Sequence, residues 1–193
     1  MVTKYFPQEK SIIEEAIDLE EVLVLGRLKF DNPSERMRYL ILQRKTRKVW
    51  PYATLAAKRL TELNERLTKI KDKSDRRDYI KMIQEYLEDE FKEELKNLTK
   101  TEGQILVKLL YRQTGITTYE LVRELRSGWN AFWYNTTASF FNISLKEKYL
   151  PETVEEDFLI EDILQRSFRK NILEPQEPAI EIDYLHLLEK WNS

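Results

Sequence analysis

Residues 99–120, TKTEGQILVKLLYRQTGITTYE, decide the fold class of this 193-residue chain. A Thr-x-x-Glu pattern begins at Thr99 and again at Thr117, and it marks helix starts because the Thr and Glu side chains can cap the free backbone N–H groups of the first turn. Gly115, between the two patterns, is typical of the residue that ends a helix. We therefore predict two consecutive helices, over residues 100–113 and 118–126.

Helix signals also precede this stretch. Asn32, followed by Pro33 and Glu35, predicts a helix start, and Pro51 predicts that this helix ends or kinks near Trp50. Beyond the proline, apolar residues recur at spacings of three and four, which is the pattern of one helix face. The two stripes, which we expect to form an antiparallel hairpin, cover residues 52–70 and 74–98.

The same signals continue toward the C-terminus. Thr153 with Glu156 predicts the start of a helix that runs to about Asn171. Pro175 and Pro178 indicate a linker. A last short amphipathic helix is predicted over residues 184–191.

One stretch near the N-terminus differs from the rest. Residues 19–25, LEEVLVL, favour a short strand or extended arm that must lie on the helices, find a second strand, or pair with a partner. With 41% hydrophobic residues the chain can bury one core. We predict an all-α (mainly α) fold, a single domain of helical hairpins around one core. Its parts are an N-terminal arm (1–31), a helical domain (32–171) and a C-terminal appendage of linker and short helix (172–193).

The composition excludes several kinds of function. The chain has no cysteine and one histidine, His186, so thiolate chemistry and zinc, haem or iron–sulfur sites are not expected. We expect no cofactor, no metal site and no catalytic constellation. No run approaches the roughly 20 apolar residues that cross a bilayer. The first ten residues lack the apolar core of a signal peptide.

Charge is balanced overall, because 32 basic residues face 34 acidic ones and the net charge is −2. The helix after Pro33 is nevertheless basic. It could bind phosphate or an acidic partner, or it could be an exposed face paired with acidic residues near 85–94. We favour the second interpretation and expect no nucleic-acid binding. The basic residues are Arg36, Arg38, Arg44, Lys45, Arg47 and Lys48.

Carboxylates one helical turn apart occur at Asp157 and Glu161. Such a pair could act as acid and base or hold a divalent cation. Acidic residues in the first turn of a helix are stabilised by its dipole, which explains Glu155 and Glu156 without catalysis. For Asp157 and Glu161 we likewise favour a role without catalysis or cation binding. His186, alone in the terminal helix, is expected to be a surface or packing residue.

Unusual residues concentrate in residues 111–115 and 125–136. Two arginines there could bind a carboxylate or phosphate group, two tryptophans could form an apolar wall, and two amides could orient a ligand. Alternatively the aromatics are core, and the arginines are satisfied by helix-end carbonyls and by acids such as Glu124 or Asp157. We favour this second account. The candidate ligand-binding residues are Arg112, Gln113, Arg126, Trp129, Trp133 and Asn135.

A resemblance rests on separated blocks of this region, RQTG at 112–115, ELRSGW at 124–129 and AFWYN at 131–135, with WPYA at 50–53 and EGQIL at 102–106. Together they resemble a bacterial family known as a domain of unknown function, over roughly residues 19–171. The resemblance implies no established activity. Members of that family resemble exported helical proteins of Gram-negative bacteria, so the resemblance implies the periplasm or cell envelope. This chain shows no signal peptide, so the cytoplasm stays open.

The functional prediction follows from these points. We expect a non-enzymatic interaction or scaffold module of the bacterial cell envelope, with a protein partner that pairs through the N-terminal arm. The alternative is a small anionic-ligand binding protein, or an enzyme, that uses the cluster of Arg112, Arg126, Trp129 and Trp133.

Overall fold

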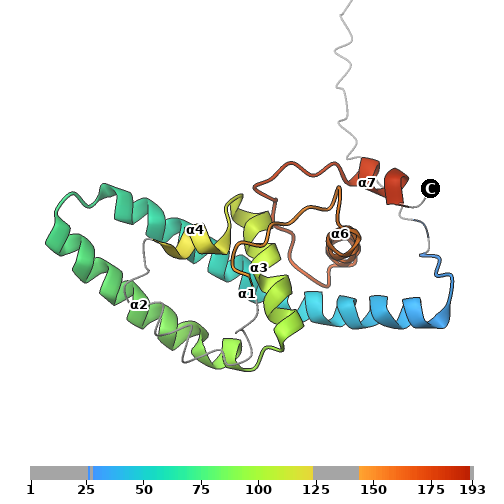
Figure 1. Cartoon of the computed structure of the whole chain (residues 1–193), viewed down its shortest axis with the longest axis horizontal. Coiled ribbons are helices and arrows are strands. Elements are labelled where there is room, and N and C mark those ends of the chain that lie inside the picture. The colour runs from blue at the N-terminus through green and yellow to red at the C-terminus, as the bar shows by residue number, and fades with distance from the viewer. Residues whose placement is uncertain (1–25, 27, 124–143, 192–193) are drawn as a thin grey trace, which may run out of the picture.

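The computed structural model describes residues 26, 28–123 and 144–191, and every regular element in these ranges is a helix (Figure 1). The all-α prediction is confirmed. The predicted strand or arm over residues 19–25 lies outside the described residues. None of the described helices is long and apolar enough to span a membrane. The helices are α1 (Pro33–Lys69), α2 (Lys73–Lys96), α3 (Lys100–Thr114), α4 (Thr118–Arg123), α6 (Glu155–Arg169) and α7 (Tyr184–Trp191).

The start of α1 is as predicted. The Asn32 side chain accepts a hydrogen bond from the Glu35 backbone N–H at 2.9 Å, and Pro33 opens the helix. Pro51 does not end it, so the separate helix expected from residue 52 is the second half of α1. Trp50 and Ala53, on either side of the proline, are both buried, whereas Pro51 is exposed. Core packing thus continues the helix across the proline, and the change of direction of α1 in Figure 1 is the bend that a proline causes.

The second half of α1 and α2 form the predicted hairpin. The two helices contact each other and run in opposite directions (Figure 1). The Asp72 side chain begins α2 by accepting hydrogen bonds from the backbone N–H groups of Ser74 and Asp75, at 2.7 and 3.1 Å. This aspartate holds the turn at the tip of the hairpin.

Helix α3 lies at the centre of the fold and packs most extensively on α1. Thr99 and Glu102 form the predicted capping box, and Gly115 ends the helix with a φ of +72°. Glycine tolerates this left-handed conformation without the strain that a Cβ atom would add. The buried core around α3 includes Val49, Trp50, Ala53, Ala57, Ile105, Leu109, Leu121, Ile160 and Leu164.

Helix α6 crosses α1 and carries α7. The predicted start at Thr153 is wrong, because the capping position is Val154 and no side chain caps this end. The backbone N–H groups of Thr153 and Val154 both donate to the Leu150 carbonyl, so a turn precedes the helix and shifts its start. Helix α7 has the predicted bounds and packs on α6 through an apolar cluster of Phe158, Tyr184 and Leu187.

Candidate functional site

The six candidate residues divide into two groups. Arg126, Trp129, Trp133 and Asn135 lie outside the described residues, so their interpretation as pocket or core stays a prediction. Arg112 and its neighbour Gln113 lie in the last turn of α3, and both are buried. The described part of the candidate site therefore centres on Arg112.

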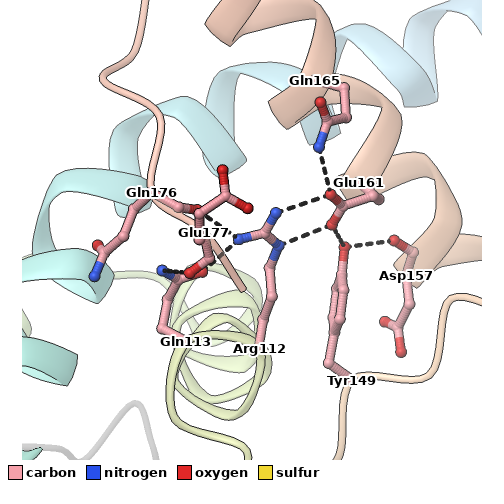
Figure 2. Close-up of polar contacts among 8 residues, drawn as sticks. All are labelled: Arg112, Gln113, Tyr149, Asp157, Glu161, Gln165, Gln176 and Glu177. Atoms are coloured by element: carbon pink, nitrogen blue, oxygen red, sulfur yellow. Dashed lines mark hydrogen bonds and ion pairs between the residues drawn. The ribbon is translucent and has the colours of Figure 1, made fainter. Parts of the chain in front are cut away.

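Arg112 forms a fork-to-fork ion pair with Glu161 of α6 (Figure 2). Its Nε donates to one carboxylate oxygen at 2.8 Å and its Nη2 to the other at 2.9 Å. The third nitrogen, Nη1, donates to the Gln113 side-chain carbonyl and to the Gln176 backbone carbonyl. Both partners of the pair are only 1% exposed. Every nitrogen of the guanidinium therefore has an acceptor within the protein.

Both carboxylate oxygens of Glu161 also have additional hydrogen-bond partners within the protein. The Tyr149 hydroxyl lies 2.9 Å from its Oε2, and the Gln165 amide donates to its Oε1 at 3.0 Å (Figure 2). Burial alone would raise the pKa of Glu161, but the contacts with Arg112, reinforced by Gln165 and Tyr149, lower it below the usual 4.5. Burial, and then the Glu161 charge, raises the pKa of Tyr149 well above 10.0. The carboxylate is thus held ionised beside a neutral phenol.

The segment after α6 covers the remaining side of Arg112. The Arg112 backbone carbonyl accepts from the Ala179 N–H at 2.9 Å. The Trp50 indole donates to the Glu174 carbonyl at 3.0 Å, and the Arg112 guanidinium lies 5.4 Å from the Trp50 ring centroid. A cation over an indole ring at this distance is stabilised by the ring quadrupole. The segment between α6 and α7 therefore closes the end of α3.

Asp157 has a different environment, one turn before Glu161. Lys108 of α3 donates to it at 2.6 Å, and the Leu150 backbone N–H at 2.8 Å. Burial raises the pKa of Asp157, and these hydrogen bonds only partly oppose the shift. Burial alone would lower the pKa of Lys108, but Asp157, and then Glu156, raise it. The two carboxylates that could have formed a functional pair thus bind separate cations, Lys108 and Arg112.

The acidic residue after Glu161 forms a second buried centre. The Asp162 carboxylate, with no exposed surface, accepts from the hydroxyl groups of Tyr39 at 3.0 Å and Tyr184 at 2.7 Å. Arg166, one turn later, donates to both of its oxygens at 2.9 Å and to the Gly26 carbonyl at 2.9 Å. Asp162 therefore ties α6 to α1 and α7.

The sequence patterns described above did not indicate this centre or the Tyr149 contact. A signal was present, because Phe158, Ile160 and Ile163 lie on different sides of α6, so that the helix is apolar around most of its circumference. Two adjacent carboxylates in such a helix must find buried partners. The identity of those partners depends on tertiary contacts, and nothing in the spacing of residues indicates Tyr39 or Arg112.

The chemistry open to these groups follows from their contacts. Asp157 and Glu161 were considered as an acid–base or cation-binding pair. Their carboxylate oxygens accept hydrogen bonds from N–H and O–H groups of the protein instead. Within the described ranges, no group of three or more histidines and carboxylates is placed to hold a metal ion. His186 lies on the surface, 3.8 Å from Glu152. The arrangement joins helices and presents no free polar atom of Arg112 or Glu161.

One family matches this chain. The domain of unknown function DUF4294 matches residues 11–166, which include α1 to α4 and most of α6. The chain belongs to the DUF4294 family. This confirms the resemblance to a domain-of-unknown-function family, and the DUF4294 description carries no activity. Neither the curated proteins nor the solved structures contain a match to the chain.

Proposed function

We propose that this DUF4294 protein is a non-enzymatic interaction module, a helical scaffold that binds another macromolecule of the bacterial cell envelope. The observation that carries the proposal is the closure of its charged centre. Arg112 and Glu161, each 1% exposed, satisfy one another and their neighbours. A site for substrate needs polar groups that face accessible volume, and these groups face only the protein.

The centre fits a role in holding a scaffold in one arrangement. It joins three separated parts of the chain, namely α3, α6 and the segment that contains Gln176. A buried ion pair adds little net stability compared with apolar residues, but misplacing one partner is costly, so the pair favours a unique packing. The 37 residues of α1 extend the surface over roughly 55 Å.

The proposal has two further parts, namely that the protein is located in the cell envelope and that it binds its partner through the N-terminal arm. The envelope is supported by the resemblance to exported proteins. The arm is supported by residues 19–25, whose strand-like pattern suits pairing with a partner. Photo-crosslinking from position 22 in living cells tests both. We expect a discrete crosslinked product in the envelope fraction, and crosslinks confined to cytoplasmic proteins, or none, would contradict the proposal.

The competing function is that of a small anionic-ligand binding protein, or an enzyme, that uses the cluster of Arg112, Arg126, Trp129 and Trp133. Within this cluster, the Arg112 donors are already bound to acceptors of the protein. A thermal-shift screen with anionic metabolites, nucleotides and cell-wall fragments separates the two. A ligand at 100 times its dissociation constant would add about 2.7 kcal/mol of stability. We expect no shift. A shift that Arg126→Ala abolishes and the exposed control Arg38→Ala preserves would favour the ligand-binding function instead.

A further inference from the structure

An exposed face of α1 carries apolar residues among cations. Met37, Leu40 and Ile41 are 58%, 43% and 42% exposed. With the exposed Arg44 they follow the spacing of a single helix face. We call this surface, with the cations around it, the α1 outer face. It lies on the side of the helix opposite Tyr39, which is buried against α6.

The charged residues in this part of α1 are all of one sign. Residues 36–61 hold eight basic residues and no acidic residue, in a chain whose net charge is −2. Arg47, Lys48 and Arg59 have polar partners in the protein. The other five side chains make no hydrogen bond or ion pair to another described residue. These five are Arg36, Arg38, Arg44, Lys45 and Lys58.

A stretch of complementary character lies nearby in the sequence. Residues 11–25 contain five acidic residues and no basic one, with apolar residues between them. The DUF4294 match begins at residue 11, so this stretch belongs to the family domain. It ends beside Gly26, whose carbonyl is held by Arg166, and α1 begins a few residues later at Pro33. The stretch is therefore tethered near the start of α1, on the side that packs against α6.

We propose that residues 11–25 pack on the α1 outer face of their own chain. Ile12, Ile13, Ala16 and Ile17 would cover Met37, Leu40 and Ile41, and the acidic residues would pair with the surrounding cations. Fifteen residues can span up to roughly 50 Å, and a helix with its side chains is about 10–12 Å across, so the stretch reaches around the start of α1. This inference does not depend on the proposed function.

The tether to Gly26 favours the chain's own segment over other occupants of the α1 outer face. A tether converts docking into an intramolecular event with a millimolar effective concentration, which a second copy in dilute solution does not reach. An anionic membrane would be repelled by the five acidic residues of the tethered stretch. If residues 11–25 pack on α1 of their own chain, a protein partner that pairs with the N-terminal arm would also lie next to α1.

The absence of cysteine makes the test direct in the full chain. The variant Ile13→Cys/Leu40→Cys joins the stretch to the α1 outer face, and Ile13→Cys/Leu185→Cys is the matched control, because Leu40 is 43% and Leu185 45% exposed. Under mild oxidation we expect the first pair to close an intramolecular disulfide about ten times faster than the second. That ratio corresponds to a few exposed ion pairs together with apolar contact.

A charge-reversal series sharpens the same experiment. Adding Glu14→Lys and Glu15→Lys to the first pair should slow closure to the rate of the control, and adding Arg44→Glu and Lys45→Glu to those should restore it. Equal rates for the two original pairs would overturn the proposal. Disulfides that form only between chains would also overturn it, because they place the stretch on a second copy.

Discussion

Arg112 and Arg38 are the same side chain in opposite settings. At the end of α3, Arg112 is 1% exposed and bound by a carboxylate, an amide and a backbone carbonyl. On α1, Arg38 is exposed and makes no side-chain hydrogen bond or ion pair to another described residue. The difference teaches that charge density along the sequence does not locate the arginine that matters for stability. The basic residues of α1 lie mostly at the surface, whereas Arg112 joins α3 to α6 inside the protein.

The largest effect should come from removing the buried cation. Arg112→Met keeps an unbranched side chain of similar length but leaves Glu161 ionised and unpaired inside the protein. We expect a loss of about 3–5 kcal/mol in the free energy of unfolding, measured by chemical denaturation. A loss under about 1 kcal/mol would mean that water reaches Glu161, and the centre would then not be closed.

A slightly smaller effect is expected at the second buried centre. Asp162→Ala removes the acceptor of Tyr39, Tyr184 and Arg166, whose side chain is 15% exposed and can turn toward solvent. We expect a loss of about 3 kcal/mol. The control Tyr184→Phe removes one of the three contacts, and a loss as large as that of Asp162→Ala would show that the carboxylate does not join them.

A fall in pH should change the contributions of Glu161 and Asp157 to the free energy of unfolding in opposite directions. The folded-state pKa of Glu161 lies below 4.5, so its contribution is complete above about pH 4.5 and is lost as the pH falls toward the folded-state value. The pKa of Asp157 is raised from 3.8, so the cost of burying its charge is relieved as the pH falls. Glu161→Gln should therefore reduce, and Asp157→Asn should increase, the acid sensitivity of the free energy of unfolding.

The capping box of α3 provides a smaller effect. Thr99→Ala removes the hydroxyl that accepts from the Glu102 N–H, and about 1 kcal/mol should be lost. Thr99→Ser keeps the hydroxyl and should stay close to the parent protein. If both variants lose the same amount, the methyl group rather than the cap is responsible.

The smallest effect completes the comparison of the two arginines. Arg38→Ala should change the free energy of unfolding by less than about 0.5 kcal/mol, because the side chain is exposed. Its loss should be several-fold smaller than that of Arg112→Met in the same buffer. Equal losses would remove the distinction between the interior and the surface.

The local elements of the fold could be predicted because their signals are local. Asn32, Thr99 and Gly115 act through hydrogen bonds within one helical turn, and the structure confirms each of them. Pro51 shows the limit of such signals, since burial of Trp50 and Ala53 continues the helix past the proline. At Val154 a preceding turn moved the start of α6 away from the Thr-x-x-Glu pattern.

The site was less predictable because its contacts are distant in sequence. Arg112 was selected as a candidate, and the favoured account made it a buried arginine satisfied by helix-end carbonyls and by Glu124 or Asp157. Arg112 is buried and paired inside the protein, but with Glu161 and with the carbonyl of Gln176, which lies in the segment between α6 and α7. Glu161 lies 49 residues away, and helix packing rather than spacing brings the two together. Asp162 and its tyrosines were missed for the same reason. Arg126 and the two tryptophans stay predictions.

A double-mutant cycle of Arg112→Met and Glu161→Leu tests the central claim most directly. It asks whether each charge of the buried pair is needed mainly to satisfy the other. Chemical denaturation gives the free energy of unfolding of the parent, both single variants and the double variant. We expect the double variant to recover at least half of the loss caused by Arg112→Met, because no unpaired charge is left inside. A double variant at least as destabilised as the sum of the single variants would contradict the account.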